Sequence, residues 1–142
     1  MSTIVQFFVA TRASARAALL GGPSASRTVV ECGNFDVEEA LLDWEAHCAG
    51  RSFEEIAEAG LPEVLAEIED GPAVFSLSDT LVRSLGTASS SEIDELARWW
   101  VERKAEDGAE LDPFVALGIL RELAELIRGE RDSEEHVYCW AG

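Results

Sequence analysis

The stretch Ile4-Val5-Gln6-Phe7-Phe8-Val9 decides the fold class, because it joins β-branched and aromatic residues in the way that a buried strand does. Three further stretches have the same character, at residues 27–32, 73–77 and 136–140. Helical patterns separate these four stretches along the chain. The order predicts an α+β fold, in which a small mixed sheet of about four strands is packed with helices and some strand pairs are parallel.

The helical patterns are marked by capping residues. Asp36 and Glu39 have capping-box spacing and precede an apolar stripe that Gly50 ends, namely Val37, Leu41, Trp44 and Cys48. Ser52 and Ser89 each begin another helix with a glutamate three residues later. A proline at position 62 is suited to the first turn of a helix over residues 62–68, with Val64, Leu65 and Ile68 as its buried side.

Three more helices complete the pattern. Thr11 begins a short one that ends before residue 21, and Ser78 or Asp79 begins another that runs to residue 85. Asp112 and Pro113 begin the most apolar helix, over residues 114–127, which we expect at the centre of the core. The chain has 142 residues, of which 47% are apolar and 27% charged, so we expect one domain over residues 1–142.

The chain is strongly acidic, with a formal net charge of −17. The charge is uneven, because residues 31–70 hold 13 acids and one basic residue, Arg51. Such an excess repels nucleic acid phosphates and anionic lipids, so we expect neither direct nucleic acid binding nor membrane binding. The apolar run at residues 4–10 is also too short to span a bilayer. A basic protein partner fits the charge.

A candidate partner-binding surface follows from the helical spacing. On the helix over residues 37–48, Glu39 and Asp43 are expected opposite the apolar stripe, facing outward. The next two helices add outward acids, including Glu63 and Glu67 on the helix over residues 62–68. Trp99 falls about 100° from the buried position of Trp100, as an interface residue would. The candidate residues are Glu39, Asp43, Glu54, Glu55, Glu58 and Trp99.

No motif assigns catalysis, a metal or a cofactor. The phosphate-loop, dinucleotide-binding, zinc-protease and EF-hand patterns are absent from the sequence. The three cysteines have no CxxC spacing, which indicates reduced thiols and a cytoplasmic location. Neither His47 with Cys48 nor His136 with Cys139 is placed to face one ion. We therefore expect no cofactor and no metal, and we assign no catalytic residue.

The sequence favours a non-catalytic interaction domain that binds a basic protein, in the manner of an immunity or inhibitor protein. The alternative is a small-molecule-binding protein or enzyme with a pocket near Cys32 and a histidine, His47 or His136. A third hypothesis is a homo-oligomer whose interface covers Trp99 and Trp140. A fourth is mimicry of DNA by the acidic face.

The second half of the chain resembles the uncharacterised bacterial YfbM-like family. The residues that carry the resemblance are Phe75-Ser76-Leu77-Ser78 with Leu81 and Leu85, Ser91-Glu92-Ile93-Asp94-Glu95-Leu96, the helix over 113–128, and Val137-Tyr138-Cys139-Trp140-Ala141-Gly142. The resemblance covers residues 73–142 and an N-terminal strand, lies in the order of elements, and does not extend to residues 31–70. It implies an α+β domain and no catalytic residues.

Overall fold

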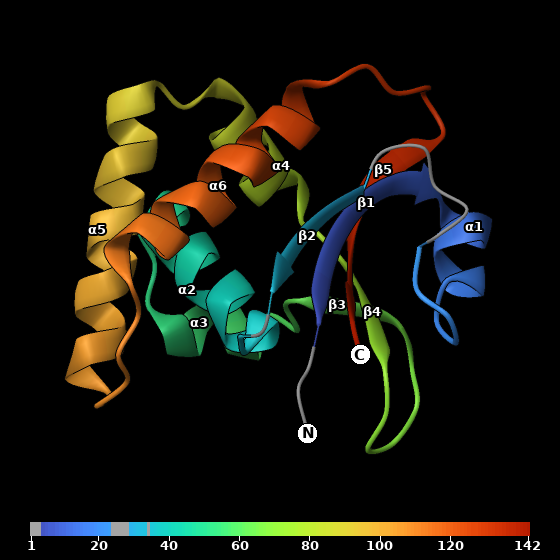
Figure 1. Ribbon diagram of the computed structural model, residues 1–142, viewed down its shortest axis with the longest axis horizontal. Coiled ribbons are helices and arrows are strands. Elements are labelled where there is room, and N and C mark those ends of the chain that lie inside the picture. Colours follow the sequence, from blue (N-terminus) through green and yellow to red (C-terminus); the bar gives the residue numbers. More distant parts are fainter. Residues whose placement is uncertain (1–3, 24–28, 34) are drawn as a thin grey trace.

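The computed structural model describes residues 4–23, 29–33 and 35–142. These residues form six helices and one five-stranded sheet (Figure 1). In chain order the elements are β1 Val5–Thr11, α1 Arg12–Ala17, β2 Val29–Gly33, α2 Val37–Ala49, α3 Phe53–Glu58, β3 Glu63–Glu67, β4 Ala73–Ser76, α4 Asp79–Thr87, α5 Ser90–Glu106, α6 Pro113–Arg128 and β5 Glu135–Ala141.

The sheet has the order β2-β1-β5-β4-β3, and each neighbouring pair is antiparallel. Its centre is the long pairing of β1 with β5, from Val5 opposite Ala141 to Thr11 opposite Glu135. The α+β fold is confirmed, with five strands where about four were predicted. The expectation of parallel strand pairs is wrong, because every strand runs opposite to its neighbours in the sheet, whether a helix or a turn connects them. The predicted strand over residues 27–32 is β2, and residues 27 and 28 lie outside the described part of the chain.

The predicted helix over residues 62–68 is instead the edge strand β3. It pairs with β4 across a tight turn, in which the backbone N–H of Ile68 donates to the carbonyl of Pro72 at 2.9 Å. Asp70 in this turn has a φ of 58°. Val64 and Ile68, which we expected to be buried, are 41% and 40% exposed. The antiparallel pairing of Glu63–Glu67 with β4 and the turn that closes it are contacts outside the segment itself, and they outweigh the local helical pattern.

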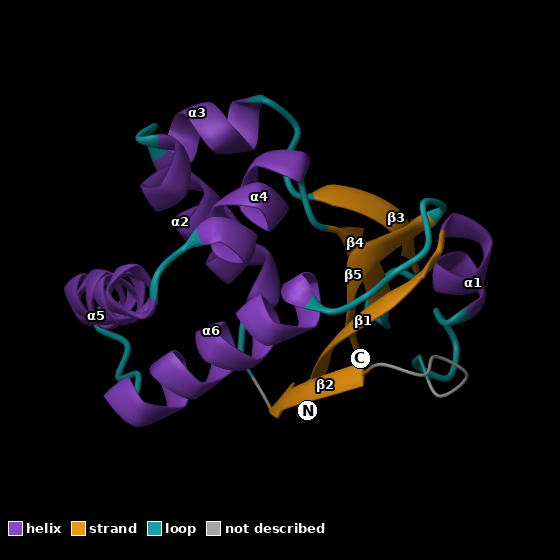
Figure 2. Ribbon diagram, turned by 90° about the horizontal axis from the view of Figure 1, so that it is seen from above, coloured by secondary structure: helices purple, strands orange, loops and turns teal. Residues whose placement is uncertain are grey.

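The helices divide between the two faces of the sheet. Figure 2 shows α2 to α6 gathered on one side and α1 on the other. Successive side chains of β1 point to opposite faces of the sheet. Phe7 packs in the core with Trp44 and Trp100, and Phe8 packs with Tyr138 on the α1 side. The first strand is therefore buried on both faces, which explains its nearly continuous apolar run.

The predicted capping residues begin the helices. Thr11, Asp36, Ser52, Ser78, Ser89 and Asp112 each accept a backbone N–H of the first turn. Ser52 with Glu55 and Ser89 with Glu92 form complete capping boxes. The side chain of Asp36 accepts the backbone N–H of Glu39 at 3.1 Å, but the carboxylate of Glu39 forms an ion pair with Lys104 on α5. The capping box predicted at Asp36 is therefore only half formed.

None of the helices in the described ranges combines the length and the apolar character that a bilayer crossing requires.

Candidate functional site

The candidate surface residues Glu39, Asp43 and Trp99 meet where α2 lies against α5. We call this contact the α2–α5 seam and define it by three side-chain pairs: Glu39 with Lys104, Asp43 with Arg103, and His47 with Trp99. The three α2 residues are spaced four apart, so they lie on one side of that helix. α5 packs against that side in the opposite direction.

Asp43 does not face solvent, and this part of the sequence-based expectation is wrong. The residue is 1% exposed, because α5 covers the side of α2 that lies opposite the Val37 stripe. Burial raises the pKa of Asp43 from 3.8 to about 6, and the nearby Lys104 and Arg103 lower it only in part. Its Oδ2 atom finds no hydrogen-bond donor in the described part of the chain. Asp43 is thus a buried acid whose charge is only partly compensated.

Arg103 links the seam to the end of α5. Its Nε atom lies 3.9 Å from Oδ1 of Asp43, and its Nη1 atom donates to Oδ1 of Asp107 at 3.0 Å. The hydrogen bond to Asp107 raises the pKa of Arg103, so the guanidinium stays charged. Glu39 is neutralised in a similar way, by Lys104 at 2.5 Å. Each of the two acids that α2 contributes to the candidate surface therefore has a cation from α5 beside it, at 2.5 Å for Glu39 and at 3.9 Å for Asp43.

Trp99 is half-buried at the third pair of the seam. Its ring lies 4.6 Å from the ring of His47, and it packs against the main core. His47 itself is exposed in the last turn of α2. Trp99 therefore covers the edge of the core and presents an aromatic surface beside an exposed histidine.

The remaining candidates lie on α3, where the acids are exposed. Glu55 completes the capping box of Ser52, and Arg51 donates to its carboxylate at 3.5 Å. These hydrogen bonds lower the pKa of Glu55. Glu54 and Glu58 are exposed and form no ion pair with any residue that the structure describes. The acids expected on the next helix, Glu63 and Glu67, lie on β3, and Glu63 pairs with Arg12 at 3.5 Å.

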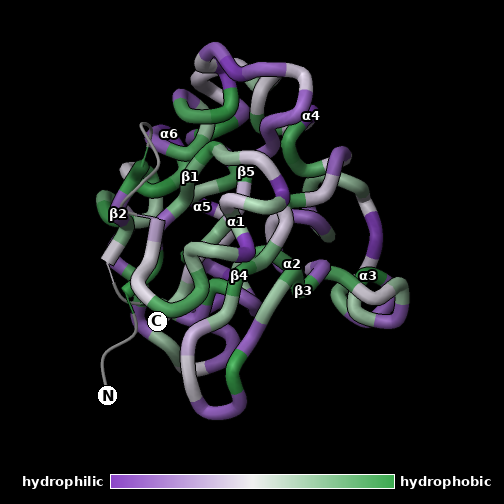
Figure 3. The backbone as a smooth tube through the Cα atoms, turned by 90° about the vertical axis from the view of Figure 1, so that its right-hand side faces the viewer, coloured by the Kyte–Doolittle hydropathy of each residue, from purple (hydrophilic) through white to green (hydrophobic). Residues whose placement is uncertain are grey.

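A second group of exposed acids lies at the β3–β4 hairpin. The turn between β3 and β4 holds Glu69 and Asp70, both exposed, and Glu67 precedes them on β3. Figure 3 shows hydrophilic residues gathered at the tip of this hairpin. Most of the acids of residues 31–70 are therefore spread over two helices, α2 and α3, and the β3–β4 hairpin, and the third helix expected in this segment is a strand.

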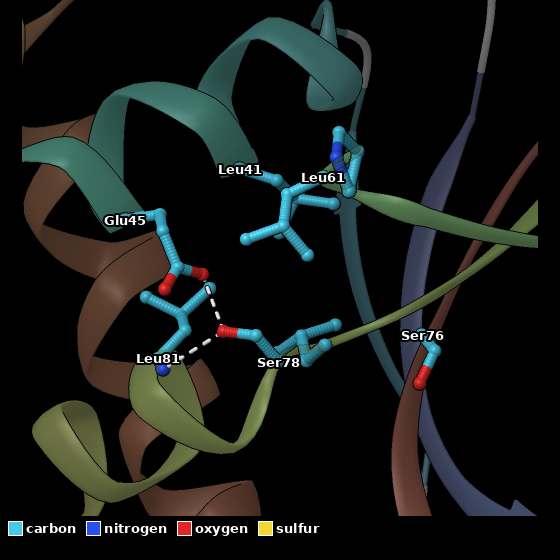
Figure 4. Close-up of a pocket in the computed structure, with 8 residues that line it drawn as sticks. Leu41, Glu45, Leu61, Ser76, Ser78 and Leu81 are labelled. Carbon is cyan, nitrogen blue, oxygen red and sulfur yellow. Dashed lines mark hydrogen bonds between the residues drawn. The ribbon is translucent and has the colours of Figure 1, made fainter. Parts of the chain in front are cut away.

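A small cavity lies between α2, α4 and the start of β3, and it contains a buried glutamate. Glu45 is 5% exposed and accepts a hydrogen bond from the hydroxyl of Ser78 (Figure 4). Ser78 accepts in turn from the backbone N–H of Leu81 at 3.0 Å, so one hydroxyl caps α4 and partners a buried carboxylate. The cavity has a volume of about 10 Å³, which is room for about one water molecule. Its lining consists of Leu41, Glu45, Leu61, Pro62, Ser76, Leu77, Ser78 and Leu81.

The pocket that the alternative hypothesis places near Cys32 has little support. Burial raises the pKa of the Cys32 thiol to about 12, with Glu122 and Glu31 adding to the effect, so the nucleophilic thiolate is disfavoured. Burial likewise raises the pKa of Cys48 to about 11, and Cys139 is fully buried. The described residues form no cluster of three or more side chains that could hold a metal ion.

Trp140, the other residue of the homo-oligomer hypothesis, is held within the chain. Its indole N–H donates to the carbonyl of Leu19 at 3.0 Å, and its ring packs in the cluster on the α1 side of the sheet. Trp140 is half-buried in this arrangement. A role at an interface between copies of the chain is therefore not needed to explain this tryptophan.

The roles of Glu45, Ser78 and Arg103 as partners of buried groups were not predicted from the sequence. A signal for Glu45 was present, because Val37, Leu41 and Glu45 are spaced four apart and the glutamate therefore belongs to the apolar stripe. Arg103 gave no comparable signal. Its role depends on how α2 and α5 pack, which local spacing does not contain.

No family model, curated protein or solved structure matches the chain. The resemblance to the YfbM-like family therefore stays a prediction that rests on the order of elements.

Proposed function

We propose that this chain is a non-catalytic protein-interaction domain that binds a basic protein partner through the acidic surface of α3. The observation that carries the proposal is the contrast between two sets of acids. Glu39 and Asp43 each have a cation of the chain beside them, and Asp43 is buried, whereas Glu54 and Glu58 are exposed without an ion pair to any described residue. Carboxylates that the fold leaves unmatched are available to a partner.

Each candidate residue has a distinct part in this proposal. Glu54 and Glu58 supply the field that steers a basic partner, and the net charge of −17 extends that field. Glu55 contributes less to this field, because its carboxylate already accepts hydrogen bonds from Ser52 and Arg51. Glu39 and Asp43 support the surface by holding α2 against α5. Trp99, beside the exposed His47, offers an aromatic contact at the edge of the surface.

The experiment begins with affinity capture from a cell extract at low and at high salt, followed by mass spectrometry. It continues with association kinetics of the purified partner, measured for the wild type and for the double variant Glu54→Lys/Glu58→Lys. We expect the association rate constant to fall by about tenfold or more in the double variant, and to fall with added salt in the wild type.

The matched control is Glu130→Lys/Glu134→Lys. It makes the same change in net charge at two exposed acids between α6 and β5, at the end of the molecule away from α3 (Figure 1). Equal losses in both double variants would mean that only net charge matters, and the α3 surface would be rejected. Capture of no basic protein at either salt concentration would reject the proposal altogether.

No observation in the described part of the chain favours the alternative of an enzyme or small-molecule-binding protein near Cys32. The raised pKa of that thiol argues against a nucleophile there. The cavity at Glu45 is lined by neither a cysteine nor a histidine.

A further inference from the structure

The exposed side of α6 carries the most exposed large apolar side chain in the described part of the chain. Phe114 is 86% exposed and the adjacent Val115 is 51% exposed. The residues that follow on the buried side of α6, from Ala116 to Ile127, form the centre of the core. α6 is thus apolar on two sides, and only one of them is covered by the fold.

Gly118 lies one helical turn after Phe114, on the same exposed side. A Cβ atom placed on Gly118 would meet no atom within 4 Å, so packing within the chain does not require a glycine here. Glycine in a helix interior is destabilising relative to alanine. Gly118 therefore lowers the stability of α6, and no close contact within the chain requires a glycine at this position. A glycine at an exposed helix position lets the backbone of another molecule approach closely.

Carboxylates flank this apolar side at both ends. Glu110 and Asp112 precede Phe114, and Glu122 and Glu125 follow Gly118 at helical spacing. All four are exposed, and none forms an ion pair with a residue in the described ranges. The nearby cation Arg121 is already paired with Asp94, at 2.9 Å.

We infer that the Phe114–Val115–Gly118 face of α6 docks a basic amphipathic helix of a protein partner. The apolar residues of that helix cover Phe114 and Val115, and its backbone crosses α6 at Gly118. Its lysines and arginines meet the carboxylates at the two ends of the face. A second copy of this chain is a poor occupant, because it would bring four more carboxylates against these four.

This inference goes beyond the proposed function, because it concerns another surface. Figure 2 shows α3 and α6 on opposite sides of α2 and α4. A partner that reached α3 would leave the Phe114–Val115–Gly118 face open. The two proposals can therefore fail independently.

The test uses a synthetic leucine–lysine peptide with the helical period and a second peptide of the same composition in scrambled order. Chemical shifts of the isotope-labelled chain are followed during titration with each peptide. We expect the amphipathic peptide alone to bind tightly, with the largest shift changes between residues 110 and 125. Phe114→Ser should weaken binding by about tenfold, as the loss of a central aromatic contact does. The matched control is Leu20→Ser, at a residue that is 81% exposed beyond α1, and it should bind as the wild type does.

The variant Gly118→Leu distinguishes an effect on peptide binding from an effect on the stability of the fold. Leucine favours the helix more than glycine does, so this variant should melt at a higher temperature while binding the peptide about tenfold more weakly. Gly118→Ala should also raise the melting temperature.

Three results would overturn the inference. The first is equal binding of the scrambled peptide, and the second is unchanged affinity in Phe114→Ser. The third is a wild-type dimer that Phe114→Ser converts to monomer, because the occupant would then be a second copy. Glu54→Lys/Glu58→Lys, which tests the other proposal, should leave the pattern of shifted residues in place.

Discussion

The acids of the α2–α5 seam and those of α3 come from one acid-rich segment, residues 31–70, yet they lie in opposite environments. In the seam, Asp43 is 1% exposed and has Arg103 beside it. On α3, Glu54 and Glu58 stand in solvent without an ion pair to any described residue. The comparison teaches that a count of acids does not tell which of them can steer a partner. Exposure and the nearest cation decide this for each carboxylate.

The largest expected effect concerns the pH dependence of the seam. The pKa of Asp43 is raised from 3.8 to about 6, so the folded state holds this proton more tightly than the unfolded chain. The resulting stability is present below the ordinary pKa and is lost as the pH rises through about 6. Two pKa units correspond to about 3 kcal/mol in the free energy of unfolding.

The measurement is urea unfolding of the wild type and Asp43→Asn over this pH range. Asp43→Asn keeps all the other titrating groups, so the difference between the two proteins at each pH reports the titration of Asp43 alone. The free-energy difference between the two proteins should change by about 3 kcal/mol as the pH rises. If both proteins have the same pH dependence, Asp43 does not behave as a buried acid and the contrast with α3 disappears.

Two serines that cap helices differ in the same way as the two groups of acids, because one is partly buried and the other is exposed. Ser78 caps α4 and also donates to the buried Glu45, whereas Ser52 caps α3 in solvent. Ser78→Ala should lower the free energy of unfolding by about 2–3 kcal/mol, of which about 1 kcal/mol is the cap. Ser52→Ala should cost about 1 kcal/mol. Denaturant melts of both variants measure the difference, and equal losses would show that the bond to Glu45 contributes nothing.

Two arginines provide the next contrast. Arg103→Met removes the cation beside Asp43 and should lower the free energy of unfolding by about 1–2 kcal/mol at neutral pH. The loss is limited because Asp43 can take up a proton instead, at about 1.4 kcal/mol per pKa unit. Arg51→Met breaks an exposed pair with Glu55 and should cost about 0.5 kcal/mol or less. Thermal melts of the two variants side by side give the comparison, and a larger loss for Arg51→Met would reverse it.

The smallest effect on stability is expected on α3. Glu54→Gln/Glu58→Gln should change the free energy of unfolding by less than about 0.5 kcal/mol, because both side chains are exposed and neither has an ion pair with a residue that the structure describes. The same variant should associate more slowly with a basic partner and depend less on salt. Unfolding curves and stopped-flow association, measured on one preparation, distinguish the two outcomes. A stability loss comparable to that of Arg103→Met would mean that these acids are structural.

Four of the five strands and the starts of the six helices in the described part of the chain could be predicted from the sequence, because both depend on local chemistry. Caps such as Asp112 and the apolar run that contains Phe7 are local signals. The hairpin of β3 and β4 was missed although it too carried a signal. Asp70-Gly71 between two apolar runs favours a tight turn, and Asp70 adopts the left-handed conformation there. The proline at position 62 and the spacing of Val64 and Ile68 favoured a helix, and strand pairing outweighed them.

The candidate site was harder to predict than the fold. The positions of Glu54 and Glu58 follow from one helix and its cap, and they are exposed as expected. The burial of Asp43 depends on α5, which lies about 60 residues further along the chain. Helical spacing gives the direction of a side chain but not the helix that will cover it. The same limit applies to Glu45, which is buried by α4 and by the segment that leads into β3.

The pairing of β1 with β5 has a consequence for the order of events during synthesis. The two outermost described residues exchange backbone hydrogen bonds, Ile4 N–H to Gly142 at 2.7 Å and Gly142 N–H to Ile4 at 3.0 Å. The middle of the sheet thus joins the earliest and the latest parts of the described chain. During synthesis, Phe7 and Phe8 leave the ribosome before Cys139 and Tyr138, their partners on β5, which lie about 130 residues further along the chain. The sheet can therefore be completed only after β5 has been translated, and the apolar side chains of β1 lack their β5 neighbours until then.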